Sequence, residues 1–128
     1  MPKRILIADD NEQNLYLSRF LLEQHGFNVM VARNGVQCLD LAQTELPDLI
    51  LMDIQMPEMD GYEAIRQLRA TPKVGAIPIV VVSSYAMAND RERALSLGCS
   101  GYIEKPIVPE SFVRQVSEYL DTQSPTEG

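Results

Sequence analysis

Residues 48–61 read Asp-Leu-Ile-Leu-Met-Asp-Ile-Gln-Met-Pro-Glu-Met-Asp-Gly, and this stretch decides the fold class. Leu49–Met52 is a continuous run of Leu, Ile and Met that ends directly before Asp53. Such a short apolar run is typical of a central strand that is covered on both faces of a sheet. Asp60 is a good residue to cap the amphipathic segment that follows. The stretch therefore predicts a buried strand, an acidic loop and a helix.

Short apolar runs of the same kind recur along the chain, rich in Ile, Val and Leu and bounded by polar or turn residues. These features are typical of strands. We expect strands at Ile5–Ala8, Val29–Ala32, Leu49–Met52, Ile79–Val82 and Tyr102–Ile103.

Between these runs lie segments whose apolar residues recur at the spacing of helical turns, and two of them end near Gly26 and Gly98. The apolar stripes are Leu15, Leu17, Leu21 and Leu22; Val36, Leu39 and Ala42; Ile65 and Leu68; Ala94 and Leu97; Phe112, Val113, Val116 and Leu120. Alternating strands and helices predict an α/β fold with a five-stranded parallel sheet and helices on both faces. Five units in a chain of this length favour the flavodoxin-like strand order 2-1-3-4-5, although alternation alone does not fix the order.

Size and composition indicate one soluble globular domain. The chain has 128 residues, of which 45% are hydrophobic and 23% charged. We expect a domain over residues 1–121 and a flexible polar tail over 122–128. The net charge of −7 argues against direct binding to nucleic acid, which draws on clustered basic residues.

Nothing in the sequence indicates secretion or a membrane span. The apolar run near the N-terminus is too short for a signal peptide, and no later stretch could cross a bilayer. Cys38 and Cys99 lie far apart and in no metal-binding spacing, so we expect two free thiols in a reducing compartment. These features predict a cytoplasmic protein.

Charged and hydroxyl side chains follow four of the predicted strands. Asp9 and Asp10 follow the first strand, Asp53 the third, Ser83 the fourth, and Lys105 comes just after the fifth. In parallel sheets, function collects at the carboxyl ends of the strands, so these residues are expected to meet in one crevice.

The chemistry of this set points to a cation and a phosphoryl group. Three close carboxylates repel one another unless a cation is present, and an oxygen-only ligand set selects a hard cation such as Mg²⁺. Lys105 supplies a positive charge for a phosphoryl oxygen, Ser83 a hydrogen bond, and Asp53 a carboxylate nucleophile. Taken singly, each residue has an ordinary explanation: Asp9 or Asp10 as a helix cap, and Lys105 as a solvated charge. Their coincidence at four strand ends favours a site.

The motifs closely resemble the receiver domain of two-component response regulators. They are Ile5-Leu-Ile-Ala-Asp-Asp-Asn11, the stretch 48–61, Pro78-Ile-Val-Val-Val-Ser-Ser84 and Gly101-Tyr-Ile-Glu-Lys-Pro106. The resemblance runs from about Lys3 to Leu120. Among receivers of the CheY-like superfamily, the chain looks most like the stand-alone DivK-type regulators.

The resemblance implies a role for each site residue. Asp53 matches the phosphoacceptor, Asp10 a direct Mg²⁺ ligand, and Asp9 a ligand that acts mainly through water. The backbone carbonyl of Gln55 matches the third protein ligand, and Lys105 the lysine that contacts the phosphoryl group.

Further positions match residues that, in this family, change conformation on phosphorylation or support the site. Ser83 and Tyr102 match the hydroxyl and aromatic residues that respond to phosphorylation, and Pro106 matches a position preceded by a cis peptide bond. Gln55 and Tyr85 match two positions that tune dephosphorylation. Both side chains are large enough to hinder an attacking water, so slow loss of phosphate is expected.

Several functions remain as alternatives. A phosphatase that forms an aspartyl phosphate would need an acid where Gln55 stands, and a flavodoxin-like electron carrier would need a phosphate loop where Asp9 and Asp10 stand. A degenerate receiver would act only as a binding module, which the intact acidic set disfavours. The resemblance implies a non-enzymatic phosphoacceptor without an output domain. Its partners would be a histidine kinase or a histidine phosphotransfer protein, and a target bound through the fourth helix, fifth strand and fifth helix.

Overall fold

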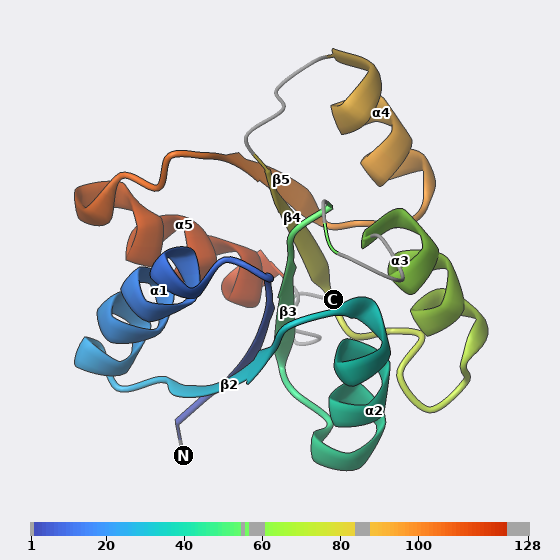
Figure 1. Ribbon diagram of the computed structural model, residues 1–128, viewed down its shortest axis with the longest axis horizontal. Helices are drawn as coiled ribbons and strands as arrows, with labels where there is room; N and C mark the ends of the chain where they lie inside the picture. Colours follow the sequence, from blue (N-terminus) through green and yellow to red (C-terminus); the bar gives the residue numbers. More distant parts are fainter. Residues whose placement is uncertain (1, 55, 57–60, 84–87, 123–128) are drawn as a thin grey trace.

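A parallel sheet with helices on both faces forms the molecule (Figure 1). The computed structural model describes residues 2–54, 56, 61–83 and 88–122. The elements alternate strictly along the chain. In order they are β1 (Arg4–Ala8), α1 (Glu12–Gln24), β2 (Asn28–Ala32), α2 (Gly35–Glu45), β3 (Leu49–Met52), α3 (Gly61–Ala70), β4 (Ile79–Ser83), α4 (Ala88–Ser96), β5 (Gly101–Glu104) and α5 (Pro109–Thr122).

The strand order is β2-β1-β3-β4-β5, and all the pairings are parallel, which confirms the predicted topology. Residues 5 to 8 of β1 pair with 29 to 32 of β2 on one side and with 49 to 52 of β3 on the other. This order leaves β2 and β5 at opposite edges of the sheet. It also brings the carboxyl ends of β1, β3, β4 and β5 to one rim.

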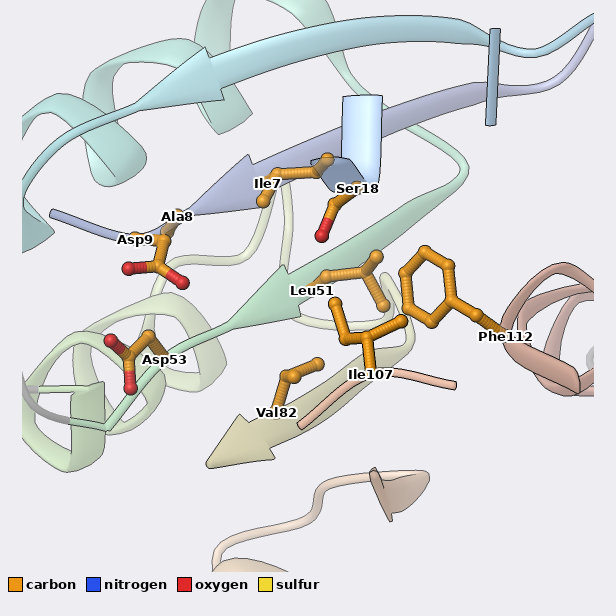
Figure 2. A pocket seen from close by; sticks show the side chains of 9 residues that line it. All are labelled: Ile7, Ala8, Asp9, Ser18, Leu51, Asp53, Val82, Ile107 and Phe112. Carbon is orange, nitrogen blue, oxygen red and sulfur yellow. The ribbon is translucent and has the colours of Figure 1, made fainter. Parts of the chain in front are cut away.

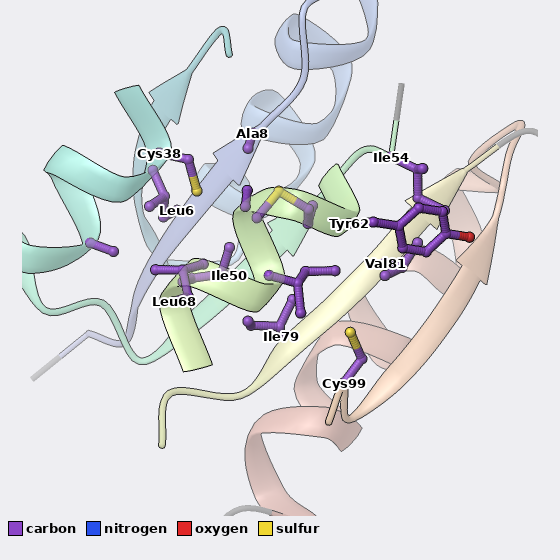
Figure 3. Close-up of a cluster of buried hydrophobic side chains, with 14 of the residues drawn as sticks. Leu6, Ala8, Cys38, Ile50, Ile54, Tyr62, Leu68, Ile79, Val81 and Cys99 are labelled. Carbon is purple, nitrogen blue, oxygen red and sulfur yellow. The ribbon is translucent and has the colours of Figure 1, made fainter. Parts of the chain in front are cut away.

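Successive residues of each strand point to opposite faces of the sheet, and each face has its own apolar cluster. Leu6, Ile50 and Val81 pack with α2, α3 and α4 (Figure 3). Ile7 and Leu51 pack with α1 and α5 on the other face. Figure 1 shows α1 and α5 together on one side of the sheet, with α2, α3 and α4 on the other. A strand buried on both faces must be apolar throughout, which explains the continuous run in β3.

Local polar and glycine residues set the helix ends. The Asn11 side chain accepts a hydrogen bond from the Asn14 backbone at 2.9 Å, and Asn34 does the same for Gln37 at 2.8 Å. Both are N-caps of the ordinary kind. The chain leaves α1 and α4 through glycines with positive φ, 90° at Gly26 and 91° at Gly98. The predicted cap at Asp60 lies outside the described residues.

The predicted apolar stripe of α2 is wrong at one position. Val36 is 45% exposed, whereas Cys38 and Ala42 are fully buried. Cys38 and Ala42 are four residues apart and therefore share a helix face, and Val36 lies two residues before Cys38 on a different face. The small Cys and Ala side chains let α2 lie close to β1 and β2.

Both cysteines are free and buried, as expected. Burial without a charged partner raises the pKa of the Cys38 thiol to about 12. Burial also raises the pKa of Cys99, to about 11, although Arg69 opposes part of this shift. Both side chains therefore remain neutral thiols at physiological pH. Within the described part of the chain, no helix is long and apolar enough to span a membrane.

Candidate phosphoacceptor site

The candidate site lies on the rim where four parallel strands end. Asp9 directly follows β1, Asp53 directly follows β3, Ser83 ends β4, and Lys105 directly follows β5. Backbone pairing continues past the strand ends and fixes these residues. The Asp53 amide donates to the Ala8 carbonyl at 2.8 Å, and the Lys105 amide donates to the Ser83 carbonyl at 2.8 Å. The site is thus an extension of the sheet rather than a set of loose loops.

Four of the five side chains predicted to meet at this rim lie close together, namely Asp9, Asp10, Asp53 and Lys105. The Lys105 ammonium lies 2.9 Å from an Asp9 carboxylate oxygen and 3.5 Å from an Asp53 oxygen. One carboxylate oxygen from each of Asp9, Asp10 and Asp53 lies within 4.8 Å of the others. Asp9 and Asp53 are 5% and 7% exposed, whereas Asp10 is exposed at the mouth of the site.

The charges in this cluster fit a hard divalent cation. Three carboxylates and one ammonium give the four side chains a combined formal charge of −2. Close carboxylates repel most strongly where burial limits solvent screening. Oxygen ligands without His or Cys suit Mg²⁺, which keeps several coordination positions for water and phosphate. The residues present therefore fit a magnesium site.

Asp9 does not cap α1, because Asn11 fills that position, but it has a structural role in the turn before the helix. Its second carboxylate oxygen accepts a hydrogen bond from the Asn11 backbone at 2.9 Å, just before α1 begins. The same side chain therefore shapes the turn into α1 and contributes charge to the site. The turn holds the Asp9 carboxylate in place for Lys105.

The two residues expected to form a switch occupy different environments. Ser83 is 1% exposed at the end of β4, beside the Lys105 backbone. Tyr102 is half-buried on β5 and packs against the cluster beneath α3 and α4. The peptide bond before Pro106, for which a cis geometry was expected, is cis. Gln55 and Tyr85 lie outside the described residues.

Gly61 has a role that the sequence analysis missed. A Cβ atom at this position would lie 2.5 Å from the Asp53 carbonyl oxygen and 2.6 Å from the Ile54 Cα. The Gly61 amide donates to the Ile54 carbonyl at 2.7 Å. Only glycine permits this approach, so the first residue of α3 packs directly against the backbone of Asp53. The Asp-Gly pair that closes residues 48–61 is the sequence signal for this contact.

A small cavity lies beneath the carboxylates, between the sheet and α1 and α5 (Figure 2). It has about 10 Å³ of room for a water centre, close to the minimum for one molecule. Asp9, Asp53 and the buried Ser18 provide its polar lining. The other lining residues are apolar, namely Ile7, Ala8, Leu51, Val82, Ile107 and Phe112. The lower side of the site is therefore largely closed, and a ligand reaches the carboxylates from the rim.

Comparison with known proteins gives the family. Residues 5–117 match the model of the response regulator receiver domain. The chain belongs to this family. It is 43% identical over 120 residues to the polar-differentiation response regulator DivK of Brucella anthropi, covering 94% of this chain and 98% of that protein. It therefore functions as a receiver domain of the two-component signalling type.

Solved receiver structures share the fold. A CheY-like receiver domain protein from Methanospirillum hungatei aligns over the full length of both chains with a TM-score of 0.88 and 31% identity. The receiver domain of a Pseudomonas aeruginosa sensor histidine kinase aligns over 94% of this chain and 99% of its own, with a TM-score of 0.86 and 30% identity. That structure contains a magnesium ion in its active-site cleft.

Proposed function

We propose that Asp53 accepts a phosphoryl group from a phosphohistidine donor. The observation that supports this assignment is the position of its carboxylate. It is buried at the end of β3, 3.5 Å from the Lys105 ammonium, and it shares a 4.8 Å cluster with Asp9 and Asp10. A nucleophile in this setting has opposite charge close to the place where the transferred oxygens would lie.

In the proposed reaction, a carboxylate oxygen of Asp53 attacks phosphorus in line with the bond to the histidine nitrogen. The phosphorus–nitrogen bond breaks as the phosphorus–oxygen bond forms, and the nitrogen leaves with the electron pair. Lys105 neutralises negative charge on the equatorial oxygens, and its contact with Asp9 keeps it in place. A bound Mg²⁺ would supply further charge neutralisation.

The proposed ligand roles are supported by the geometry and by the family resemblance. Asp53 and the exposed Asp10 would bind the cation directly, with Asp9 acting mainly through water because Lys105 already contacts it. The backbone carbonyl of Gln55 would complete the protein ligands. Magnesium commonly uses this small number of protein groups and keeps several waters.

A switch through Ser83 and Tyr102 would carry the signal away. A phosphoryl group on Asp53 would attract the Ser83 hydroxyl through a charge-assisted hydrogen bond. Tyr102 could then turn inward, which would bias the surface of α4, β5 and α5 toward a form that binds a target protein. The coupling should be about 1–3 kcal/mol, as in other allosteric systems. Target binding with and without a phosphate mimic would measure it, and an unchanged gap in Ser83→Ala would rule out the hydroxyl link.

Other features of the proposal come from the family resemblance. The large side chains of Gln55 and Tyr85 would slow hydrolysis of the phosphoryl group, so that turnover is at most slow autodephosphorylation. The donor would be a histidine kinase or a histidine phosphotransfer protein in the cytoplasm.

The direct test is labelling with a small phosphodonor in the presence of Mg²⁺. The native chain should gain one phosphate that is labile to base and hydroxylamine, and Asp53→Asn should gain none. Asp48→Asn is a matched control, because Asp48 is an exposed acid at the other end of β3. Persistent labelling of Asp53→Asn would show that another residue is the acceptor.

A further inference from the structure

The outer surface of α1 carries an exposed aromatic pair. Tyr16 is 73% exposed and Phe20 is 48% exposed, and their rings stack with centroids 6.3 Å apart and an interplanar angle of 16°. In the described part of the chain, the other large exposed apolar side chains are Val36, Leu46, Leu95 and Val108. Scattered residues of that kind are ordinary, whereas neighbouring exposed aromatics are typical of a contact surface.

Two hollows flank this pair. One has a volume of about 110 Å³, with an apolar floor from Leu15 and Val31 beside Tyr16. The other has about 240 Å³ and lies along Phe20. Arg19 lines both hollows. A projecting aromatic ring therefore lies next to a hollow on one surface. We call this surface the α1–β2 face; it consists of Glu12, Leu15, Tyr16, Arg19, Phe20, Glu23, Val31 and Arg33.

The charges of the α1–β2 face are balanced. Arg19 pairs with Glu23 at 3.0 Å, and Arg33 pairs with Glu12. The face thus carries equal numbers of basic and acidic side chains, on a chain whose net charge is −7. The hydrogen bond from Arg33 lowers the pKa of Glu12, so this acid stays ionised at neutral pH.

We propose that the α1–β2 face binds the same face of a second copy of this chain. A two-fold contact needs a self-complementary surface, and this face has a ring next to a hollow and charges of both signs. Each Tyr16 would enter the hollow above Leu15 and Val31 of the partner copy. Arg19 of each copy would lie opposite Glu23 of the other. Stacking against Phe20 already restricts the Tyr16 ring, which reduces the entropy cost of binding.

The strand order gives this dimer a functional consequence. β2 lies at one edge of the sheet and β5 at the other, so a copy bound beside β2 leaves α4 and β5 accessible. The dimer would present two such surfaces at once. A target with two binding sites would then bind more tightly through avidity, without any change in the single contact.

Charge balance also favours a second copy over a different protein. The chain has 18 acidic and 11 basic residues, so two copies repel each other over most of their surface. The α1–β2 face avoids this repulsion because its charges are balanced. A strongly basic or acidic partner would gain little from a neutral face. The alternative is that a helix of a kinase binds this face. The experiments below distinguish that alternative from dimerisation.

Sedimentation of the full chain over roughly 1–500 μM should show a reversible monomer–dimer equilibrium. Tyr16→Ala should weaken dimerisation at least about tenfold, which corresponds to about 1.4 kcal/mol, since truncation of an aromatic anchor at an interface centre commonly costs this much or more. Val36→Ala is the matched control, because it removes an exposed apolar side chain from a different helix, and it should leave the equilibrium unchanged.

A charge-swap pair tests the geometry. Arg19→Glu and Glu23→Arg should each fail to dimerise, because like charges would then face each other across the two-fold axis. An equal mixture of the two variants should form heterodimers, in which both opposite-charge contacts are restored. Arg66→Glu, which alters the exposed Arg66–Glu63 pair on α3, should behave as the native chain.

A native chain that stays monomeric at all concentrations would overturn the proposal. So would a mixture of the two charge variants that does not associate. If Tyr16→Ala instead weakens only binding to a histidine phosphotransfer protein, the face belongs to that partner and the dimer is wrong. None of these outcomes depends on phosphorylation of Asp53.

Discussion

At the scale of single residues, Asp10 is the site carboxylate that is exposed and reachable by a cation from solvent. A cation that binds only the folded chain stabilises it by about 2.7 kcal/mol at one hundred times its dissociation constant. For a domain of this size, Mg²⁺ should therefore raise the melting temperature by roughly 5 °C or more. Asp10→Ala should abolish most of this shift, because it removes a proposed direct ligand.

Without metal, we expect Asp10→Ala to affect the stability of the fold differently. Asp10→Ala should then be no less stable than the native chain, because it relieves repulsion from Asp9 and Asp53. Thermal melts with Mg²⁺ and with a matched ionic-strength control measure both effects. Asp40→Ala, an exposed acid on α2, should keep the full shift. A full Mg²⁺ shift in Asp10→Ala would mean that the cluster is not the metal site.

Individual residues of the site could be predicted because each one follows a strand end. Asp9 and Asp53 directly follow apolar runs and Lys105 comes two residues after one, so a parallel sheet brings them together. The contact between Lys105 and Asp9 was not predicted, since the pattern does not show which carboxylate the ammonium reaches. Gly61 was missed for a similar reason: its role depends on close backbone packing, which leaves no apolar or charged pattern.

At the scale of elements, Arg69 connects α3 to the segment that leads into β4 and to the turn after α4. One of its terminal nitrogens donates to the carbonyls of Gly75 at 2.8 Å and Ile77 at 2.7 Å, and the other donates to Gly98 at 2.7 Å. Burial lowers the pKa of this guanidinium. Arg69→Ala would leave backbone acceptors without their donor and should cost about 2–4 kcal/mol.

Urea titration of Arg69→Ala against Arg66→Ala checks this contribution. Arg66 lies on the same helix but is 60% exposed, so its removal should change stability by at most about 0.5 kcal/mol. Equal losses in the two variants would show that the Arg69 contacts add little to the free energy of unfolding.

The elements themselves were largely predictable. Short, continuously apolar runs predict the strands, and β5 differs from its prediction only by one more residue at each end. Helix faces are harder to predict, because a small residue such as Cys38 can lie against the sheet while a larger apolar one such as Val36 stays in solvent. Hydrophobicity alone does not show how closely α2 approaches the strands.

At the scale of the whole molecule, strand order is the feature that joins the fold to its function. The order β2-β1-β3-β4-β5 gathers the acids, Ser83 and Lys105 at one rim, and it places the α1–β2 face and β5 at opposite edges. Alternation of strands and helices predicted a parallel sheet, but the order depended on chain length and on the family resemblance. Long-range pairing of strands leaves no local pattern in the sequence.

The central claim is that Asp53 carries the phosphoryl group, and borohydride reduction followed by peptide mapping tests it most directly. Reduction converts an aspartyl phosphate to homoserine, which marks the modified residue permanently. After incubation with a phosphodonor and Mg²⁺, we expect homoserine at position 53 and at no other acid. Homoserine at position 9 or 10, or no conversion despite added phosphate, would contradict it.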